Sequence, residues 1–263
     1  MDLQLNDKTA VITGATAGIG LEIARKLAVE GAEAILTGRS QAKLDAAVAN
    51  IQACGGVRVR GVLADAATAE GAAALLTAVP RVDILVNNLG IYESKPFADI
   101  TDADWRAIFE VNVLSGARLA RAYFPAMLAQ NWGRVIFISS ESALMIPGEM
   151  IHYGMTKTAQ LSISRGLAQL TRGTAVTVNS VLPGPTRSEG VVDFLRSVAA
   201  DPTAPADEIE AEFFAKWRAT SLLQRMIEPE EIASMVAYLA SPLSSATNGA
   251  ALRVEGGLIP TAA

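Results

Sequence analysis

Tyr153 and Lys157 lie four residues apart, and this spacing could support proton transfer. Residues i and i+4 share one face of a helix, so an ammonium would lie beside a phenol. A free tyrosine titrates near pH ~10, and a neighbouring cation favours its phenolate and lowers its pKa. The pair is therefore a candidate proton donor and acceptor near neutral pH.

A glycine-rich turn near the amino terminus is the second chemical feature. It has the sequence Thr13-Gly14-Ala15-Thr16-Ala17-Gly18-Ile19-Gly20 and lies between an apolar run and an amphipathic helix. Glycines let a backbone approach a pyrophosphate, and a helix N-terminus offers free N–H groups and a positive dipole. The spacing G-x-x-x-G-x-G differs from the commoner G-x-G-x-x-G. The turn predicts a nucleotide site, and a glycine-rich turn without a ligand is the alternative.

Short apolar runs alternate with amphipathic helical stretches along the chain. Helix signals include a stop at Gly31, a capping box from Thr101 to Asp104 and a start at Pro229. Six repeats of the strand–helix pattern predict an α/β fold with a doubly wound parallel sheet and right-handed crossovers. No change in composition marks a second domain, so residues 1–263 are expected to form one. The expected strands are 9–13, 34–37, 57–63, 82–87, 134–139, 175–181 and 250–254.

Residues 184–223, which we name the lid segment, interrupt this alternation because they lack a strand pattern. Pro202 and Pro205 separate two helical pieces, 188–200 and 206–219, each with an apolar face. An insertion after the carboxyl end of a strand lies where open α/β sheets bind ligands. We expect a helical lid over the substrate. A packed excursion or a subunit contact is the alternative.

Composition argues against several classes of function. The chain has 22 basic and 27 acidic residues, a net charge of −5, and no basic stripe, so nucleic acid is not an expected partner. No stretch approaches the ~20 apolar residues of a membrane helix, and no signal peptide pattern is present. Cys54 and His152 are the only residues of their types, so a metal site of His and Cys is not expected. The expected location is the cytoplasm.

In their order and spacing, the motifs resemble the short-chain dehydrogenase/reductase family, in its shorter single-domain branch, over essentially the whole chain. The resemblance implies a Rossmann fold and a nicotinamide cofactor. Leu89 stands where the family usually has alanine, and Glu255 where aspartate is commoner, but neither removes a reactive group. The matching motifs are the glycine turn, Asp65, Asn87-Asn88-Leu89-Gly90, Asn112, Ser140, Tyr153-x-x-x-Lys157, Pro183-Gly184 and Glu255-Gly256-Gly257.

The resemblance also implies residue roles. Tyr153 would donate a proton during carbonyl reduction and accept one during alcohol oxidation, while Lys157 would lower its pKa and hold the nicotinamide ribose. Ser140, favoured by spacing over Ser139 and Ser142, would orient the substrate oxygen. Asn112 would hold a water that connects Lys157 to solvent; satisfying a helix kink is its alternative role. The expected cofactor contacts are Gly14, Thr16, Gly18, Ile19, Gly20, Arg39, Ser40, Asp65, Ala66, Asn88, Gly90, Tyr153, Lys157, Pro183, Gly184 and Thr186.

The choice of cofactor depends on the end of the second strand, Leu36-Thr37-Gly38-Arg39-Ser40. No acidic residue is present to bind a ribose 2′-hydroxyl. Arg39 can pair with a 2′-phosphate, with Ser40 as a second donor, or can be a solvated loop cation. Ala17 argues the other way, because this position is often basic in NADP-preferring relatives. We expect NADP(H), with NAD(H) as the alternative.

The expected substrate pocket is apolar, which predicts a small, largely apolar ketone, aldehyde or secondary alcohol. Glu141 is either a pocket acid or a salt-bridged structural residue, and Arg187 could reach in from the lid segment. His152 adjoins Tyr153 but would lie on another helix face. The expected substrate contacts are Tyr92, Ser140, Leu144, Ile146 and Met150.

Three functions stay open at this level. The first is an NADP(H)-dependent carbonyl reductase, and the second is an NAD-dependent alcohol dehydrogenase that acts mainly in oxidation. The third is a nucleotide-sensing module without turnover, which would have no need of Tyr153, Lys157 and Ser140 together. Relatives usually form tetramers through their two long helices, here 101–130 and 150–172, and their last strand, so the resemblance implies a homotetramer.

Overall fold

The computed structural model describes residues 2–262, with all of their side chains except those of Glu189 and Asp193. Within this range seven parallel strands form one sheet in the order β3-β2-β1-β4-β5-β6-β7. The predicted doubly wound sheet is therefore confirmed, with small shifts at the strand ends. The strands are β1 Thr9–Ile12, β2 Glu33–Gly38, β3 Val59–Leu63, β4 Ile84–Asn87, β5 Gly133–Ile138, β6 Val176–Pro183 and β7 Ala251–Val254.

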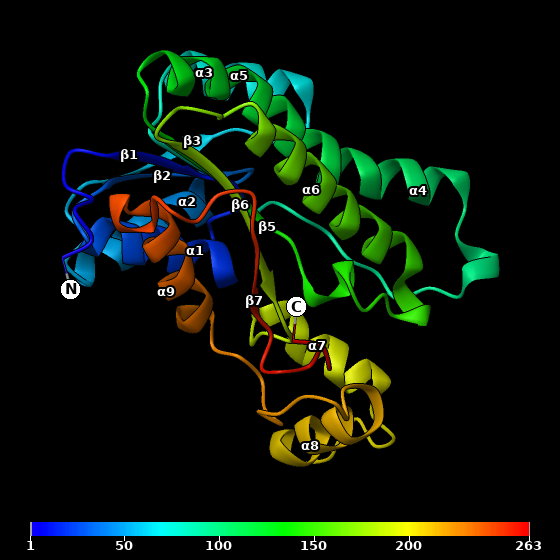
Figure 1. Cartoon of the computed structure of the whole chain (residues 1–263). Helices are drawn as coiled ribbons and strands as arrows, with labels where there is room; N and C mark the ends of the chain where they lie inside the picture. The colour runs from blue at the N-terminus through cyan, green and yellow to red at the C-terminus, as the bar shows by residue number, and fades with distance from the viewer. Residues whose placement is uncertain (1, 263) are drawn as a thin grey trace.

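Helices cover both faces of the sheet (Figure 1). Helices α1, α2 and α9 pack on one face, and α3, α5 and α6 pack on the other. This two-sided burial explains why the central strands are mostly apolar on both faces. The α-helices are α1 Gly18–Val29, α2 Gln41–Ala53, α3 Ala69–Ala78, α4 Asp102–Phe109, α5 Ser115–Ala129, α6 Ile151–Gln169, α7 Glu189–Val198, α8 Ala206–Trp217 and α9 Pro229–Ala240.

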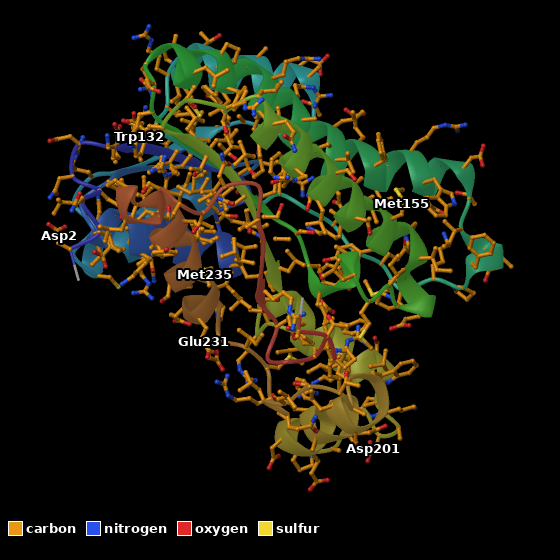
Figure 2. The ribbon with its side chains drawn as sticks, in the orientation of Figure 1. Asp2, Trp132, Met155, Asp201, Glu231 and Met235 are labelled. Atoms are coloured by element: carbon orange, nitrogen blue, oxygen red, sulfur yellow. The ribbon has the colours of Figure 1, made fainter. Side chains whose placement is uncertain are left out.

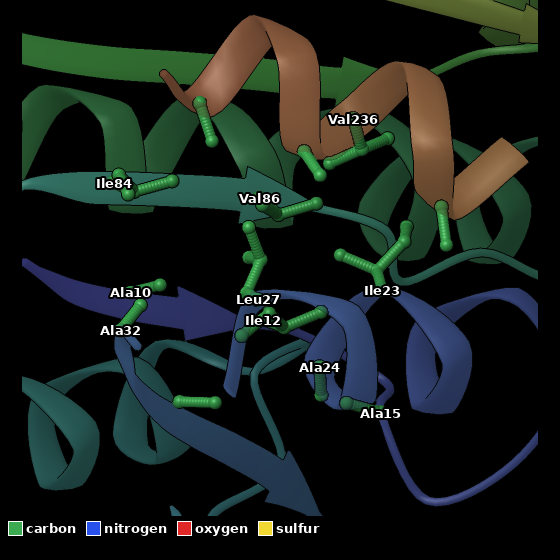
Figure 3. Close-up of a cluster of buried hydrophobic side chains, with 14 of the residues drawn as sticks. Ala10, Ile12, Ala15, Ile23, Ala24, Leu27, Ala32, Ile84, Val86 and Val236 are labelled. Carbon is green, nitrogen blue, oxygen red and sulfur yellow. The ribbon is translucent and has the colours of Figure 1, made fainter. Parts of the chain in front are cut away.

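The core on the α1 face joins the strands to two helices distant in sequence. Figure 3 shows Ile12 of β1 and Val86 of β4 beside Ile23 and Leu27 of α1, with Val236 of α9 completing the cluster. Ile23 and Leu27 are fully buried, as their i, i+4 spacing on one helix face predicts. This packing holds the start of α1 against the end of β1.

The helix-end signals in the sequence are confirmed. Helix α1 ends just before Gly31, which has a φ of +99°. Thr101 and Asp104 form a capping box at the start of α4, and Glu228 with Glu231 forms another ahead of Pro229 in α9. The two capping boxes satisfy N–H groups that a helix N-terminus leaves without partners, and the Gly31 N–H donates to the Ala28 carbonyl at the C-terminus of α1.

A π-helical turn, Glu110–Leu114, divides the single helix that was expected over residues 101–130. Asn112 lies in this turn, and its Nδ2 donates to the Ile91 carbonyl (2.8 Å) and to Thr156 Oγ1 (3.0 Å). Its Oδ1 accepts from the Ile91 N–H at 2.7 Å. The turn therefore ties the chain after β4 to helix α6, at the asparagine for which the sequence left a helix kink as an alternative role.

The sheet reverses its winding direction between β1 and β4, which are neighbours. Ligands of doubly wound folds bind outside the carboxyl ends of the strands at such a switch point. The glycine turn follows β1, residues 88–90 follow β4, and the lid segment follows β6, so all three lie at this end. Figure 2 labels Asp201 of the lid segment and, at the opposite end of the molecule, Trp132.

The lid segment contains the two helices that the sequence predicts, as α7 and α8. They have a small core of their own, formed by Leu195, Ile209, Phe213, Phe214 and Met226. Among the described residues, no helix is both long enough and apolar enough to cross a membrane.

Candidate active site

A cavity of about 240 Å³ opens at the carboxyl ends of the strands and brings together residues from distant segments. The lid segment contributes Val191, Phe194, Leu195 and Phe213 to its wall. The predicted site residues that line it are Ile19, Asn88, Gly90, Tyr92, Ser140, Met150, Tyr153, Lys157, Pro183, Gly184 and Thr186.

The glycine turn is locked to the end of β4 by one side chain. Asn88 Nδ2 donates to the carbonyls of Thr13 (2.9 Å) and Gly14 (3.1 Å). A Cβ atom on Gly20 would lie 2.5 Å from this same nitrogen, so a glycine is needed there. Gly14 and Gly18 have φ values of +62° and +55°, which larger residues rarely adopt.

The residues of the turn fit a pyrophosphate. No described side chain caps the N-terminus of α1, and its first turn has no acidic residue. Its free N–H groups and positive dipole end therefore suit an anion. Gly90 lies close to the lysine, because a Cβ built on it would be 3.5 Å from both Lys157 Nζ and Asn112 Oδ1. These features fit the nicotinamide cofactor that the resemblance implies.

The residues predicted to contact the adenosine end of the cofactor follow strands β2 and β3. Arg39 is exposed and has no hydrogen bond or ion pair with any of the residues described here. Ser40 caps α2, where its Oγ accepts from the Lys43 N–H at 3.5 Å and keeps its own proton free to donate. Asp65 Oδ1 accepts from the Ala67 N–H at 3.1 Å, and Ala66 between them is buried.

Lys157 is a buried cation held by neutral oxygens. Its Nζ donates to the Ile138 carbonyl at 2.9 Å and to Gln160 Oε1 at 3.4 Å. It lies 5.6 Å from the centre of the Tyr153 ring, which confirms that the two side chains are close together. Both come from α6, as their spacing predicts.

The acidities in the site differ from the expectation that Lys157 lowers the pKa of Tyr153. Burial raises the pKa of the Tyr153 phenol well above its usual value, the Glu141 carboxylate raises it further, and a hydrogen bond with Ser140 opposes both effects. Burial lowers the pKa of Lys157 to about 8, against the opposing effect of Glu141. The phenol is therefore protonated at neutral pH and suited to donate a proton.

The serine nearest to the phenol is the one that spacing favours. Ser139 Oγ donates to the Lys157 carbonyl at 2.9 Å, and Ser142 Oγ donates to Glu141 Oε1 at 3.2 Å, so both are committed elsewhere. Ser140 lines the cavity and hydrogen-bonds with Tyr153.

Gln160 was missed by the sequence reasoning. It is 2% exposed, and its Nε2 donates to the Asn112 carbonyl at 2.6 Å while its Oε1 accepts from Lys157. The Gln160 amide thus connects Lys157 to the backbone carbonyl of Asn112. The role of Asn112 in holding a water stays a prediction. The position of Gln160 three residues after Lys157, on the same helix face, was a signal that could have found it.

Arg218 was also missed, because nothing near it in the sequence points to the cavity. It follows α8, and its Nε lies 3.7 Å from Glu141 Oε1 while a terminal nitrogen lies 3.9 Å from Glu149 Oε1. Glu141 thus lines the cavity and takes part in a salt bridge, so the structure combines the two roles that the sequence left as alternatives.

Leu144, Ile146 and Arg187 do not lie where the sequence predicts, whereas His152 lies on the predicted helix face. Leu144 and Ile146 lie outside the cavity, 52% and 50% exposed, because the chain turns outward after the 3₁₀ turn Glu141–Ala143. Arg187 points away to Glu228 (2.9 Å) and Glu210 (3.0 Å) instead of reaching into the pocket. His152 packs edge-on against Trp105, with ring centres 5.9 Å apart, on a different face from Tyr153.

Comparisons with known proteins agree with this geometry. The model of the short chain dehydrogenase family matches residues 8–197. The uncharacterized oxidoreductase YvaG of Bacillus subtilis is 50% identical over 260 residues, covering 98% of each chain. Galactitol 2-dehydrogenase (L-tagatose-forming) of Cereibacter sphaeroides is 35% identical over 256 residues, 97% of this chain and 96% of its own. The L-sorbose reductase of Gluconobacter frateurii, complexed with NADPH and L-sorbose, superposes with a TM-score of 0.92 at 30% identity, over 99% of this chain and 100% of its own.

The chain belongs to the short-chain dehydrogenase/reductase family, and it is an NAD(P)-dependent oxidoreductase. The resemblance inferred from its motifs is confirmed. The nucleotide-sensing alternative finds no support, since these relatives are named as enzymes.

The contact between Gln160 and Lys157 predicts a shift in the lysine pKa. A hydrogen bond to the charged form favours that form, so Gln160→Met should lower the pKa of Lys157 below about 8. Gln160→Glu places a carboxylate there and should raise the pKa instead. Both variants lose the amide that donates to Asn112, so their difference isolates the acceptor.

The lysine pKa can be measured by NMR titration of protein labelled with ¹³C at lysine Cε, with Lys157→Arg used to assign the signal. Equal lysine titrations in the two Gln160 variants would contradict this account. Thermal unfolding of both variants serves as the control for general damage.

Proposed function

We propose that the enzyme transfers a hydride between NADP(H) and the carbonyl or secondary alcohol of a small substrate, with Tyr153 as proton donor and acceptor. The observation that carries this proposal is that Ser140, Tyr153 and Lys157 line one cavity with Ile19 of the glycine turn. Two relatives are named for galactitol, L-tagatose and L-sorbose, which are alcohols or ketones of this reactive type.

The cofactor supplies the hydride when it is bound. The glycine turn would hold its pyrophosphate and Lys157 its nicotinamide ribose. In reduction, the protonated Tyr153 phenol donates to the substrate oxygen, and the Ser140 hydroxyl stabilises charge that develops there. The Lys157 ammonium, fixed by Ile138 and Gln160, then stabilises the phenolate that remains.

The lid segment closes the cavity and excludes water in this proposal. An aromatic row supports the role, because it joins the lid segment to the proton donor. Tyr92 contacts Tyr153 edge-on at 6.2 Å between ring centres and Phe194 of α7 at 6.5 Å. Phe194 in turn contacts Phe213 of α8 at 6.3 Å.

NADP(H) is the proposed cofactor because Arg39 and Ser40 offer donors where a 2′-phosphate would lie. A guanidinium without another ionic partner among the described residues can pair with a dianion, and the Ser40 hydroxyl proton can add a second bond. The alternative of an NAD-dependent alcohol dehydrogenase differs in this preference.

Replacing Tyr153 with phenylalanine tests the proton donor. The variant lacks the phenolic proton, so turnover should fall by a factor of about 10²–10⁴ or more while cofactor binding persists. Steady-state ketone reduction and fluorescence titration with NADPH measure the two effects. Turnover near the wild-type rate would exclude Tyr153 as the donor.

Replacing Arg39 with aspartate tests the cofactor preference. The change removes a phosphate partner and adds a repelling charge, so the Kd for NADPH should rise at least about tenfold more than the Kd for NADH. Arg81→Asp, an exposed arginine ahead of β4, is the matched control for the change in net charge. Equal weakening of both cofactors would argue against a phosphate contact, and a native preference for NADH would favour the alcohol dehydrogenase alternative.

A homotetramer is proposed from the family resemblance. Phe109 and Leu114, beside the π turn, are each 37% exposed, and Leu170 after α6 is 63% exposed, as apolar residues of a subunit contact would be in a single chain. Light scattering after size exclusion should give the mass of four chains. The mass of a single chain would exclude this assembly.

A further inference from the structure

Glu141 is a carboxylate in the wall of the cavity, next to the serine that faces the phenol. It is only 6% exposed, yet it lines the cavity together with Ser140 and Arg218. One of its oxygens, Oε2, accepts the hydrogen bond of the Ser140 hydroxyl. The other accepts from Ser142 and faces Arg218. A buried carboxylate can only accept hydrogen bonds. It therefore needs hydrogen-bond donors from neighbouring side chains or from a molecule bound in the cavity.

Counting protons at Ser140 shows a conflict. A serine hydroxyl has a single proton to donate, and here that proton points to Glu141. The Ser140 oxygen meanwhile accepts from the Ser142 N–H at 3.1 Å and also hydrogen-bonds with the Tyr153 phenol. Ser140 can therefore donate to a substrate oxygen only by leaving Glu141 Oε2, and this buried oxygen then needs another donor.

We propose that Glu141 selects ketones that carry a hydroxyl on the carbon next to the carbonyl. That hydroxyl donates to Glu141 Oε2 and takes the place of Ser140, whose proton then turns to the substrate oxygen. The inference rests on the proposed function, and it narrows the substrate from a largely apolar carbonyl compound to an α-hydroxy ketone or, in oxidation, a vicinal diol.

Arg218 is a second polar residue of the cavity that could bind substrate hydroxyl groups. Its existing ion pairs make an acidic substrate unfavourable. Its guanidinium has five N–H donors, of which one is used by the Trp217 carbonyl at 2.8 Å. Its charge is already opposed by Glu141 and Glu149, so an anionic substrate gains no free counter-ion. Neutral hydroxyl groups can accept from the remaining N–H groups. The apolar residues of the lining, among them Phe194 and Leu195, suit the carbon side of the same molecule.

The test uses three ketones that differ at one position: 1-hydroxy-2-butanone, 2-butanone and 3-pentanone. The last two replace the hydroxyl with hydrogen or methyl. For the wild type, kcat/KM should be at least about tenfold higher for the hydroxy ketone, about the discrimination that one buried hydrogen bond provides. In Glu141→Met, which keeps much of the side-chain volume but has no oxygen that can accept this hydrogen bond, the ratio should fall toward one.

Glu149→Met is the matched control, because it also removes a carboxylate beside Arg218 but not from the cavity wall. The ratio of hydroxy ketone to ketone should survive in this control. If Glu141→Met does not fold, Glu141→Asp, which withdraws the acceptor by one methylene, is measured in its place.

The outcomes separate this inference from the proposed function. Equal rates on the three ketones in the wild type, or an unchanged ratio in the Glu141 variant, would overturn the role of Glu141 and leave the reductase intact. Reduction of none of the three with either NADPH or NADH would overturn both.

Discussion

The buried ammonium of Lys157 is the constraint on which the site depends. A cation without water needs fixed hydrogen-bond acceptors, and here they are the Ile138 carbonyl at the end of β5 and the Gln160 amide. Gln160 in turn holds the carbonyl of Asn112 in the π turn. The sheet, α6 and the helix pair α4–α5 therefore meet around one charge, and the position of Tyr153 follows from their placement.

The remaining electrostatics of the cavity balance that charge. Glu141 opposes the loss of charge from Lys157 and also disfavours the phenolate of Tyr153, so it keeps both groups protonated. Arg218, brought in by the lid segment, partly neutralises Glu141 at 3.7 Å. The charge state near the Tyr153 oxygen thus depends on Glu141, next to Ser140, and on its partner Arg218 from the lid segment, and not on the tyrosine–lysine pair alone.

Much of the fold could be predicted from the sequence because local patterns decide it. Apolar runs between glycine-marked helix ends indicated the strands, and the capping box at Thr101 and the proline Pro229 indicated helix starts that the structure confirms. A helix kink was one of two roles left open for Asn112, but the π-helical turn itself could not be predicted, because its asparagine contacts Ile91 from another part of the chain. Leu144 and Ile146 were misplaced because apolar character alone does not tell which way a loop turns.

By itself the sequence determined which reactive groups are present. They are a glycine turn before a helix, a serine after a strand, and a tyrosine and a lysine one helical turn apart. Together these groups are compatible with only a few kinds of reaction. The tertiary structure decided the pKa values of these side chains and which residues from distant segments contact them. Burial reversed the expected direction of the Tyr153 pKa, and folding brought Arg218 to Glu141 across a long stretch of chain. Both effects arise from desolvation and from contacts between distant segments, which residue types and spacing do not encode locally.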